Sequence, residues 1–516
     1  MLSNHLAISP VPIDYLRDES RKTGFANTIA FPCNTDELSA AVQLLAAKQH
    51  TITIQGARTG IAGGAVPKGH AIINLSKMDR IFSANTSDRL RVQPGVTLAT
   101  VRHYLAYTHA PSHGFFFAPD PTESSATLGG MAACNASGAC SYAYGSTRQH
   151  LEALTGILAD GDRFTLRRGL HQANGRRFSI ITENGRELTG TLPELNMPAV
   201  KNAAGYWIKR NMDLIDLLIG SEGTLAILAK LELRLTPSPA GVCGMLCFFK
   251  SVNEAITCVS QLQHTPNSNG QTALLTAIEY FDTHALRLIR ESASYTGLLL
   301  PKFKSAWHAA LYLEWALPTP DSLPLNEISQ LLTACGGDPQ DTWLATDAPS
   351  LEKLKLFRHA VPEEVNRRIG ERKQVYPELT KLGTDFSVPN DCLLQVMQRY
   401  QDDLNTAGLE HVIFGHIGNN HLHVNILPRN MEEYATGKRL YRAWAEQVVT
   451  WGGSVSAEHG IGQLKCDLLA LMYGPTGLAA MQHLKQIFDP THRLNPGCLF
   501  MNAKGSPYTK TNLPKN

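Results

Sequence analysis

The sequence predicts a two-domain α+β protein, and three observations carry that prediction. The chain has 516 residues, which exceeds the length at which single hydrophobic cores usually stop growing. Helix and strand patterns alternate up to about residue 235. After TPSP at 236–239, strand–helix–strand patterns typical of an antiparallel sheet recur. We therefore expect a first domain over 25–238, a second over 239–470 and a helical C-terminal segment over 471–502.

The first domain opens with a capped helix. Asn34 and Glu37, three residues apart, mark the start of a helix over 36–48. A second helix is predicted over 96–107. Short runs rich in β-branched residues predict strands at 51–54, 71–75 and 89–93. A hairpin is expected over 154–166, turning at Asp160-Gly161.

The second domain repeats strand and helix patterns. Strands are predicted over 244–249, 274–281 and 309–317, with a helix over 252–263. The last ~60 residues are expected to be helical and to end in the turn FDPTHRLNPG, 488–497. Residues 503–516 read as a frayed polar tail.

Composition excludes several classes of protein. The net charge of +2, without a basic run that contains aromatic residues, argues against a nucleic-acid partner. Neither a signal peptide nor an apolar stretch of transmembrane length is present. The ten cysteines are scattered, as expected for reduced thiols, and form no iron–sulfur motif. We expect a cytoplasmic protein, with peripheral attachment to the inner membrane left open.

Glycines gather at 56–64, 128–139 and 220–224. Clustered glycines on turns let backbone N–H groups approach an anionic ligand closely. The GxGxxG fingerprint of dinucleotide folds and the Walker A lysine motif are both absent. Glycine clusters also occur in ordinary loops, so this pattern alone leaves the ligand undecided.

A histidine-rich hairpin is the strongest chemical signal. In HVIFGHIGNNHLHVNIL, 411–427, the period-two alternation places His421, His423 and Asn425 on one face of a strand. The hairpin can bring His416 across from His423. Imidazole is a good ligand for zinc, manganese or iron. Single histidines are usually structural, but several at alternating positions favour a metal site.

A carboxylate and a histidine follow downstream, in SAEHGIGQLK. Glu458 is a natural third ligand, because three protein ligands with open positions define a catalytic metal site. The adjacent His459 would remain free for proton transfer, since the ordinary pKa of histidine lies near working pH.

Seven motifs then occur in a known order. GARTGIAGGAVP, PDPTESSATLGGMAACNASG, YGSTRQHL, GYWIKRNMDLIDLLIGSEGTLAIL, GHIGNNHLHVN, EHGIG and FDPTHRLNPG resemble the vanillyl-alcohol-oxidase/p-cresol-methylhydroxylase flavoprotein superfamily. The chain is most similar to its D-lactate dehydrogenase, glycolate oxidase flavin subunit and D-2-hydroxyglutarate dehydrogenase group. The resemblance covers roughly residues 25–500 and implies a two-domain flavoprotein of the p-cresol-methylhydroxylase type.

The resemblance implies an FAD-binding first domain and a substrate- and metal-binding cap domain, with the C-terminal segment returning to the first. FAD is expected to bind non-covalently, since no histidine or cysteine matches a covalent flavin position. Ala57 and Arg58 depart from a commoner Gly-Gly in the pyrophosphate loop. The residues implied to bind FAD are Gly56, Arg58, Thr59, Gly60, Gly63, Gly64, Pro119, Thr127, Gly129, Gly130, Asn135, Ser137, Gly138, Tyr144, Glu222, Gly223, Ile227 and Asn495.

The resemblance also assigns roles at the reacting centre. The metal ligands would be His416, His423 and Glu458, with His459 as the catalytic base. Asn425 would touch the substrate, and Arg358 and Lys381 are the candidates for holding its carboxylate. At 419–421 this chain has Asn-Asn-His where the family often has Asp-Gly-Asn, so His421 could compete as a ligand or reach the substrate.

The implied activity is oxidation of a D-2-hydroxy acid, D-lactate first, to the 2-oxo acid. D-2-hydroxyglutarate and glycolate are alternative substrates. Electrons would pass to an external quinone, cytochrome, electron-transfer flavoprotein or iron–sulfur subunit. Rival interpretations are an ether-lipid synthase-like flavin transferase, an electron-relay subunit and a non-catalytic module. The sequence leaves homodimer formation open.

Overall fold

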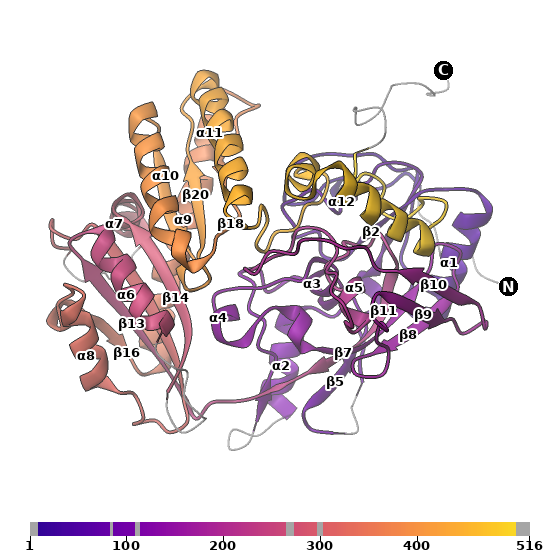
Figure 1. Cartoon of the computed structure of the whole chain (residues 1–516), viewed down its shortest axis with the longest axis horizontal. Coiled ribbons are helices and arrows are strands. Elements are labelled where there is room, and N and C mark those ends of the chain that lie inside the picture. Colours follow the sequence, from indigo (N-terminus) through magenta and orange to yellow (C-terminus); the bar gives the residue numbers. More distant parts are fainter. Residues whose placement is uncertain (1–8, 83–85, 109–113, 265–272, 297–302, 502–516) are drawn as a thin grey trace.

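The computed structural model describes residues 9–82, 86–108, 114–264, 273–296 and 303–501. Figure 1 shows two lobes joined by a narrow connection, with α12 lying on the first lobe. The predicted polar tail, 503–516, lies outside the described residues. Within the described part of the chain, no helix is both long and apolar enough to cross a membrane.

A small parallel sheet opens the first lobe. Its strand order is β1 (Thr28–Ala30), β3 (Ala71–Asn74) and β2 (Ile52–Gln55). The helix α1 (Thr35–Ala47) follows the predicted cap, because the Asn34 side chain accepts hydrogen bonds from the backbone N–H groups of Asp36 and Glu37. These elements confirm the predicted strands at 51–54 and 71–75 and the first predicted helix.

An antiparallel sheet of five strands completes the core of this lobe. Its order is β4 (Ile81–Phe82), β5 (Arg89–Val92), β11 (Ile227–Arg234), β7 (Leu151–Ile157) and β8 (Arg163–Arg167). β7 and β8 form the predicted hairpin, and Gly161 adopts a φ of 88° in its turn. The second predicted helix is α2 (Leu98–Thr108).

Smaller elements surround this sheet. The helices are α3 (Leu128–Cys134), α4 (Ser141–Tyr144) and α5 (Ile215–Leu218). β9 (Arg177–Ile181) pairs with β10 (Glu187–Thr191). β6 (Phe115–Phe116) pairs with β12 (Thr236–Pro237), so the first half of the TPSP signal is bound to the first lobe before the chain crosses over.

The second lobe is built on the predicted antiparallel sheet. Its order is β16 (Trp343–Ala345), β13 (Gly241–Phe249), β15 (Ala309–Leu317), β14 (Leu274–Asp282), β19 (His411–Gly415), β20 (His421–Ile426) and β17 (Leu382–Gly383). β18 (Phe386–Ser387) also pairs with β20. All of these pairs are antiparallel, which confirms the expected α+β architecture.

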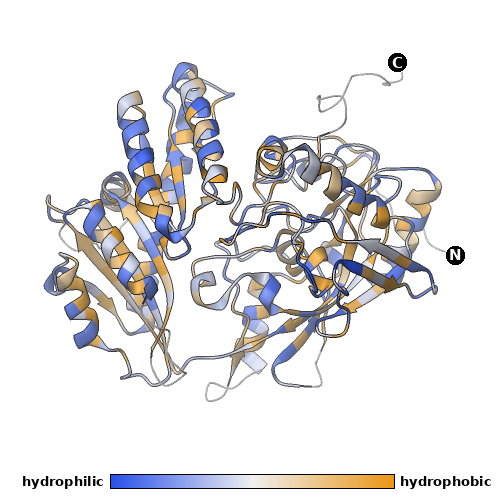
Figure 2. Ribbon diagram, viewed as in Figure 1, coloured by the Kyte–Doolittle hydropathy of each residue, from blue (hydrophilic) through white to orange (hydrophobic). Residues whose placement is uncertain are grey.

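Helices cover both faces of this sheet. α6 (Val252–His264) packs on one face of the sheet. α8 (Leu325–Ala334) and α10 (Leu393–Ala407) contact α6. α7 (Thr283–Thr296) and α9 (Ala348–Arg372) contact strands from the other face. Neighbouring strand residues alternate between the faces, since Phe249 joins one buried cluster and Phe248 the other. In Figure 2 the covering helices accordingly carry both hydrophobic and hydrophilic residues.

The end of the chain returns to the first lobe. After α11 (Met431–Thr450), residues 456–465 cross over and α12 (Cys466–Phe488) follows, with a kink at Gly474 and Pro475. The backbone N–H of Asn495 then donates to the carbonyl of Ile52 at 2.8 Å. The segment 456–465 therefore stands between the two lobes, and it contains both Glu458 and His459.

Candidate active site and metal centre

The histidine hairpin forms as predicted but with a different register. Phe414 on β19 is the partner of His423 on β20, so His416 lies in the turn beyond the paired strands. The imidazoles still gather: the ring centroid of His423 is 5.7 Å from that of His416 and 4.5 Å from that of His421. The turn, rather than strand pairing, brings His416 close to His423.

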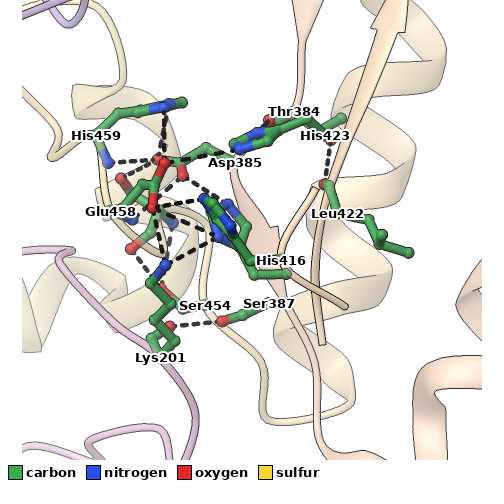
Figure 3. A network of polar contacts seen from close by, with 12 residues as sticks. Lys201, Thr384, Asp385, Ser387, His416, Leu422, His423, Ser454, Glu458 and His459 are labelled. Atoms are coloured by element: carbon green, nitrogen blue, oxygen red, sulfur yellow. Dashed lines mark hydrogen bonds and ion pairs between the residues drawn. The ribbon is translucent and has the colours of Figure 1, made fainter. Parts of the chain in front are cut away.

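Glu458 lies at the centre of this cluster (Figure 3). Its Oε2 is 3.4 Å from His416 Nε2, and its Oε1 is 3.7 Å from His423 Nε2. Donor atoms around a tetrahedral zinc ion with bonds near 2 Å are separated by about 3.3 Å. The three predicted ligands are thus spaced as a metal would require.

The two histidines predicted as ligands are each oriented by a hydrogen bond at Nδ1, the ring nitrogen that faces away from Glu458. His416 Nδ1–H donates to Glu279 Oε1 at 2.6 Å, and His423 Nδ1–H donates to the carbonyl of Thr384 at 3.0 Å. These bonds leave the Nε2 atoms facing Glu458. Metal-ligating histidines almost always carry such a carboxylate or carbonyl partner, so the donor set fits a divalent metal.

The charges of the cluster are strongly coupled. Burial opposes ionisation of Glu458, but Lys201 and His416 hold its pKa well below its usual range. Burial also opposes protonation of His416, but Glu279 and Glu458 raise its pKa to about 9. Burial lowers the pKa of His423. The pocket therefore keeps a carboxylate ionised and attracts positive charge.

Lys201 supplies a cation that the sequence did not reveal. Its Nζ lies 2.8 Å from Glu458 Oε2 and 3.5 Å from His421 Nδ1. Nothing in the pattern around Lys201 distinguishes it from a surface lysine, because the contact joins residues 257 positions apart. Only the crossing of 456–465 between the lobes brings them together.

Asp385 is the second residue that sequence reasoning missed. It is fully buried and accepts hydrogen bonds from the backbone N–H groups of Glu458 and His459 at 3.2 and 3.1 Å. Lys465 Nζ donates to it at 2.8 Å. Burial opposes its ionisation, but His459, Lys465 and His421 hold its pKa well below its usual range. Asp385 thus anchors the Glu-His pair.

His459 occupies the side of the cluster that faces a cavity of the first lobe. Its ring stacks on His423 with centroids 5.3 Å apart, and its Nε2 is 3.4 Å from Glu458 Oε1. Its Nδ1 lies 3.5 Å from Asp385 Oδ2. The side chain is 25% exposed, whereas that of Glu458 is only 12% exposed, so His459 is the more accessible of the two.

The other residues predicted at the reacting centre are Arg358, Asn425 and Lys381, and they differ in their surroundings. Arg358 is half-buried: burial opposes its charge, but Glu279 and Asp120 raise its pKa. The Asn425 side chain is buried on β20 against Gly383. Lys381 has no contact with the cluster among the interactions of the described residues, and burial and Arg21 lower its pKa.

A cavity of about 330 Å³ runs from the glycine loops to this cluster. Its walls come from residues within 54–65, 121–137 and 222–228, together with Leu75, Pro94, Glu458, His459 and Asn495. Three glycine-rich loops of the first lobe and the Glu-His pair therefore share one cavity.

Residues 238–499 match the family described as FAD linked oxidases, C-terminal domain, and residues 26–167 match an FAD binding domain. The chain belongs to the FAD-linked oxidases. This result confirms the flavoprotein superfamily that the seven motifs indicated, and with it the oxidoreductase class.

Relatives of known activity align with this FAD-linked oxidase over nearly its whole length. It is 26% identical to a D-lactate dehydrogenase of Anaerostipes hadrus, over 94% of this chain and 92% of the relative. It is 26% identical to a D-2-hydroxyglutarate dehydrogenase of Stutzerimonas stutzeri (strain A1501), over 92% and 91%. A solved structure of alkyldihydroxyacetonephosphate synthase, 15% identical, superposes with a TM-score of 0.61 over 92% of this chain and 77% of that chain. That likeness shows the fold alone.

The cavity suits the FAD that this family binds. Arg58 has a φ of 63° and Gly63 a φ of 76°. Arg58 therefore adopts the left-handed backbone that glycine takes most readily. A Cβ at Gly60 would meet nothing within 4 Å. The predicted cofactor residues that line the cavity are Gly56, Arg58, Thr59, Gly60, Gly64, Thr127, Gly129, Gly130, Ser137, Glu222, Gly223, Ile227 and Asn495.

Five predicted cofactor residues lie outside that lining: Gly63, Pro119, Asn135, Gly138 and Tyr144. Asn135 ends α3 with a φ of 52°, and its side chain accepts hydrogen bonds from Ser146 Oγ and Arg148 N. Gly138 approaches the carbonyl of Asp120 so closely that a Cβ would lie 2.0 Å from its oxygen. These two positions shape the loop that borders the cavity.

Glu222 and Asn495 both line the cavity. The Glu222 carboxylate accepts hydrogen bonds from the backbone N–H groups of Ile461 and Gly462, both at 2.7 Å. Asn495 Nδ2 donates to the Glu222 carbonyl at 2.7 Å. Burial raises the pKa of Glu222 to about 7. Both residues thus tie the C-terminal segments to the glycine loop at 220–224.

Cys134 also lines the cavity. Burial raises the pKa of its thiol to about 12, so the nucleophilic thiolate is scarce at neutral pH. Non-covalent binding of FAD stays a prediction.

Proposed function

We propose that this protein oxidises a D-2-hydroxy acid, with D-lactate the foremost candidate, to the corresponding 2-oxo acid. One observation carries the proposal: Glu458 and His459 share a cavity wall with the loops that suit FAD. The names of relatives that match over nine-tenths of the chain support it, since they include D-lactate and D-2-hydroxyglutarate dehydrogenases. D-2-hydroxyglutarate and glycolate remain alternative substrates.

Two bound groups would contribute chemistry that the side chains lack. FAD would supply the two-electron oxidation at C2 of the substrate, and a divalent metal, either zinc, manganese or iron, would supply Lewis acidity at its hydroxyl. His416, His423 and Glu458 are the proposed metal ligands, because their Nε2 and carboxylate atoms already face one another.

His459 is the proposed base for the hydroxyl proton. Its exposure to the cavity allows contact with a substrate, and Asp385 beside Nδ1 favours a proton on that nitrogen. Nε2 then offers the lone pair that accepts the proton. Asp385 also accepts the backbone N–H of His459, so it holds this residue beside the cluster.

Arg358 is the proposed partner of the substrate carboxylate, and Asn425 the proposed partner of its polar groups. Glu279, the carboxylate that accepts from His416, also raises the pKa of the half-buried Arg358, so the guanidinium lies within electrostatic reach of the proposed metal site. A guanidinium suits a carboxylate because it donates two parallel hydrogen bonds. Lys381 is a weaker candidate for the same role.

Reduced flavin must pass its electrons onward. The sequence carries neither a cysteine-rich cluster motif nor a nicotinamide fingerprint. We therefore propose an external acceptor: a quinone, a cytochrome, an electron-transfer flavoprotein or an iron–sulfur subunit.

The test is an anaerobic titration of the purified flavoprotein with D-lactate, L-lactate, glycolate and D-2-hydroxyglutarate, with and without EDTA treatment. We expect one D-acid to bleach the flavin absorption, EDTA to abolish the bleaching and added metal to restore it. A flavin that no hydroxy acid bleaches with metal present would overturn the dehydrogenase proposal. Bleaching that EDTA leaves intact would overturn the role of the metal.

A further inference from the structure

We propose that His421 is a fourth protein ligand of the metal, so that the centre has three imidazoles and one carboxylate. The proposal rests on the metal site of the proposed function and goes beyond its three ligands.

The first support is distance. Ligand atoms of His416, His421, His423 and Glu458 all lie within 4.8 Å of one another. His421 Nδ1 is 3.9 Å from Glu458 Oε2, and the ring centroids of His421 and His416 are 5.4 Å apart. His421 therefore stands with the other ligands around one point rather than behind them.

The second support is orientation. His421 Nε2 lies 3.1 Å from Asp385 Oδ1, which favours a proton on Nε2 and leaves the Nδ1 lone pair for a ligand. Asp385 is itself held by Ser456 Oγ at 2.6 Å and by Lys465 Nζ at 2.8 Å. Asp385 is thus held in place on the side of His421 away from Nδ1.

The third support is the cation that already contacts both atoms. Lys201 Nζ approaches Glu458 Oε2 at 2.8 Å and His421 Nδ1 at 3.5 Å. These two atoms consequently face the same point, and that point accommodates positive charge. His421 is fully buried, and a buried imidazole lone pair is expected to have a partner. At 3.5 Å the ammonium satisfies it only weakly, whereas a metal ion would satisfy it fully.

A fourth ligand has consequences for the site. Each protein ligand adds affinity and removes one open position, so this centre should hold its metal tightly before substrate binds. Imidazole-rich sites suit zinc, copper, iron and nickel, whereas oxygen-rich sites suit magnesium and manganese. We therefore expect zinc or iron to bind more tightly than manganese.

The experiment compares metal binding by the chelator-treated flavoprotein and its His421→Asn variant. Zinc affinity is measured by competition with a chromophoric chelator, and Co²⁺ is used as a spectroscopic probe. We expect the variant to lose at least about tenfold in zinc affinity, since even outer partners of metal ligands are worth 10–100-fold. Its visible Co²⁺ bands should also shift, because an oxygen donor would take the place of one imidazole.

The matched control is His171→Asn, a half-buried histidine of the first lobe whose Nδ1 accepts the Arg167 backbone N–H and which lies outside the cluster. It should bind zinc and Co²⁺ at this centre like the unaltered protein. Equal zinc affinity and equal Co²⁺ spectra for His421→Asn would overturn the proposal and leave His421 as a structural partner of Asp385.

A measurement on the unaltered protein guards against a variant that does not fold. Pulsed electron paramagnetic resonance of the Cu²⁺-loaded flavoprotein counts bound imidazoles through their remote nitrogens. Three imidazoles support His421 as a ligand, and two contradict it.

The outcomes separate this inference from the proposed function. Metal binding through His421 in a protein whose flavin no hydroxy acid bleaches would uphold the ligand and reject the dehydrogenase. Bleaching by a D-acid with only two imidazoles on the metal would uphold the dehydrogenase and reject His421 as a ligand. Absence of metal binding at this centre would overturn the fourth ligand and the role of the metal together.

Discussion

The His416 imidazole donates its Nδ1–H to Glu279 Oε1 at 2.6 Å, joining the turn after β19 to the middle of β14. The two residues lie 137 positions apart, and the bond fixes which nitrogen of His416 faces Glu458. A buried carboxylate behind a ligand histidine raises its basicity and its affinity for a metal.

Replacement of Glu279 by glutamine should therefore weaken metal binding about 10–100-fold, because an amide oxygen accepts the Nδ1–H without adding negative charge. Zinc competition with a chelator measures the change. Glu314→Gln is the control: it alters a nearby half-buried carboxylate that accepts from Tyr312 and Cys140 rather than from a cluster histidine. Equal losses in both variants would show that the effect is not specific to the His416 contact.

His459 is predicted to act on the substrate rather than on the metal. His459→Ala should lower the rate of flavin reduction by about 10² to 10⁴, while metal and flavin content stay unchanged. Stopped-flow bleaching by the best D-acid measures the rate. Near-normal reduction in the variant would remove His459 from the role of base, and loss of bound metal would reassign it as a ligand.

Gly56 should be essential for the cofactor cavity. A Cβ at this position would lie 2.2 Å from Thr127 Oγ1, so Gly56→Ala must displace the N-cap of α3. Overpacking of this kind costs about 1–3 kcal/mol, and we expect a lower ratio of FAD to protein and a lower melting temperature. The control is Gly370→Ala in α9, where a Cβ meets nothing within 4 Å and FAD content should not change.

Asp282 should make the stability of the protein depend on pH. Burial raises its pKa to about 7 from an ordinary value of 3.8, although the N–H groups of Ala285, Ile413 and His284 and the charge of Arg287 oppose the rise. A carboxyl group whose folded-state pKa is raised contributes its stability below pH 4 and loses it as the pH rises through 7.

The Asp282→Asn variant keeps a side-chain oxygen that can accept the Ala285 N–H at the start of α7, but its side chain does not titrate. Relative to the unaltered protein, it should gain free energy of unfolding between pH 4 and pH 8, by as much as about 4 kcal/mol, since one pKa unit corresponds to about 1.4 kcal/mol. Denaturant unfolding at both pH values measures the difference, and common contributions such as those of His284 and His411 cancel in the comparison. A constant difference between the two proteins would contradict the raised pKa.

Local patterns determined much of the architecture. The Asn34 cap, the Asp160-Gly161 turn and the alternation of His421 and His423 predicted a helix, a hairpin and a polar strand face that the structure contains. Such features depend on residues within a few positions of one another, where hydrogen bonding and side-chain periodicity act directly. The ordered motifs likewise identified the superfamily that the family matches confirm.

Tertiary structure decided what surrounds each functional group. Lys201 reaches Glu458, and Asp385 reaches the backbone of His459, only because the chain crosses between the lobes at 456–465. Register had the same effect within the hairpin, since it pairs Phe414 with His423 and leaves His416 to approach through a turn. Periodicity shows which residues share a face of one element, but the partners that set charge and tautomer come from distant segments whose packing no local pattern encodes.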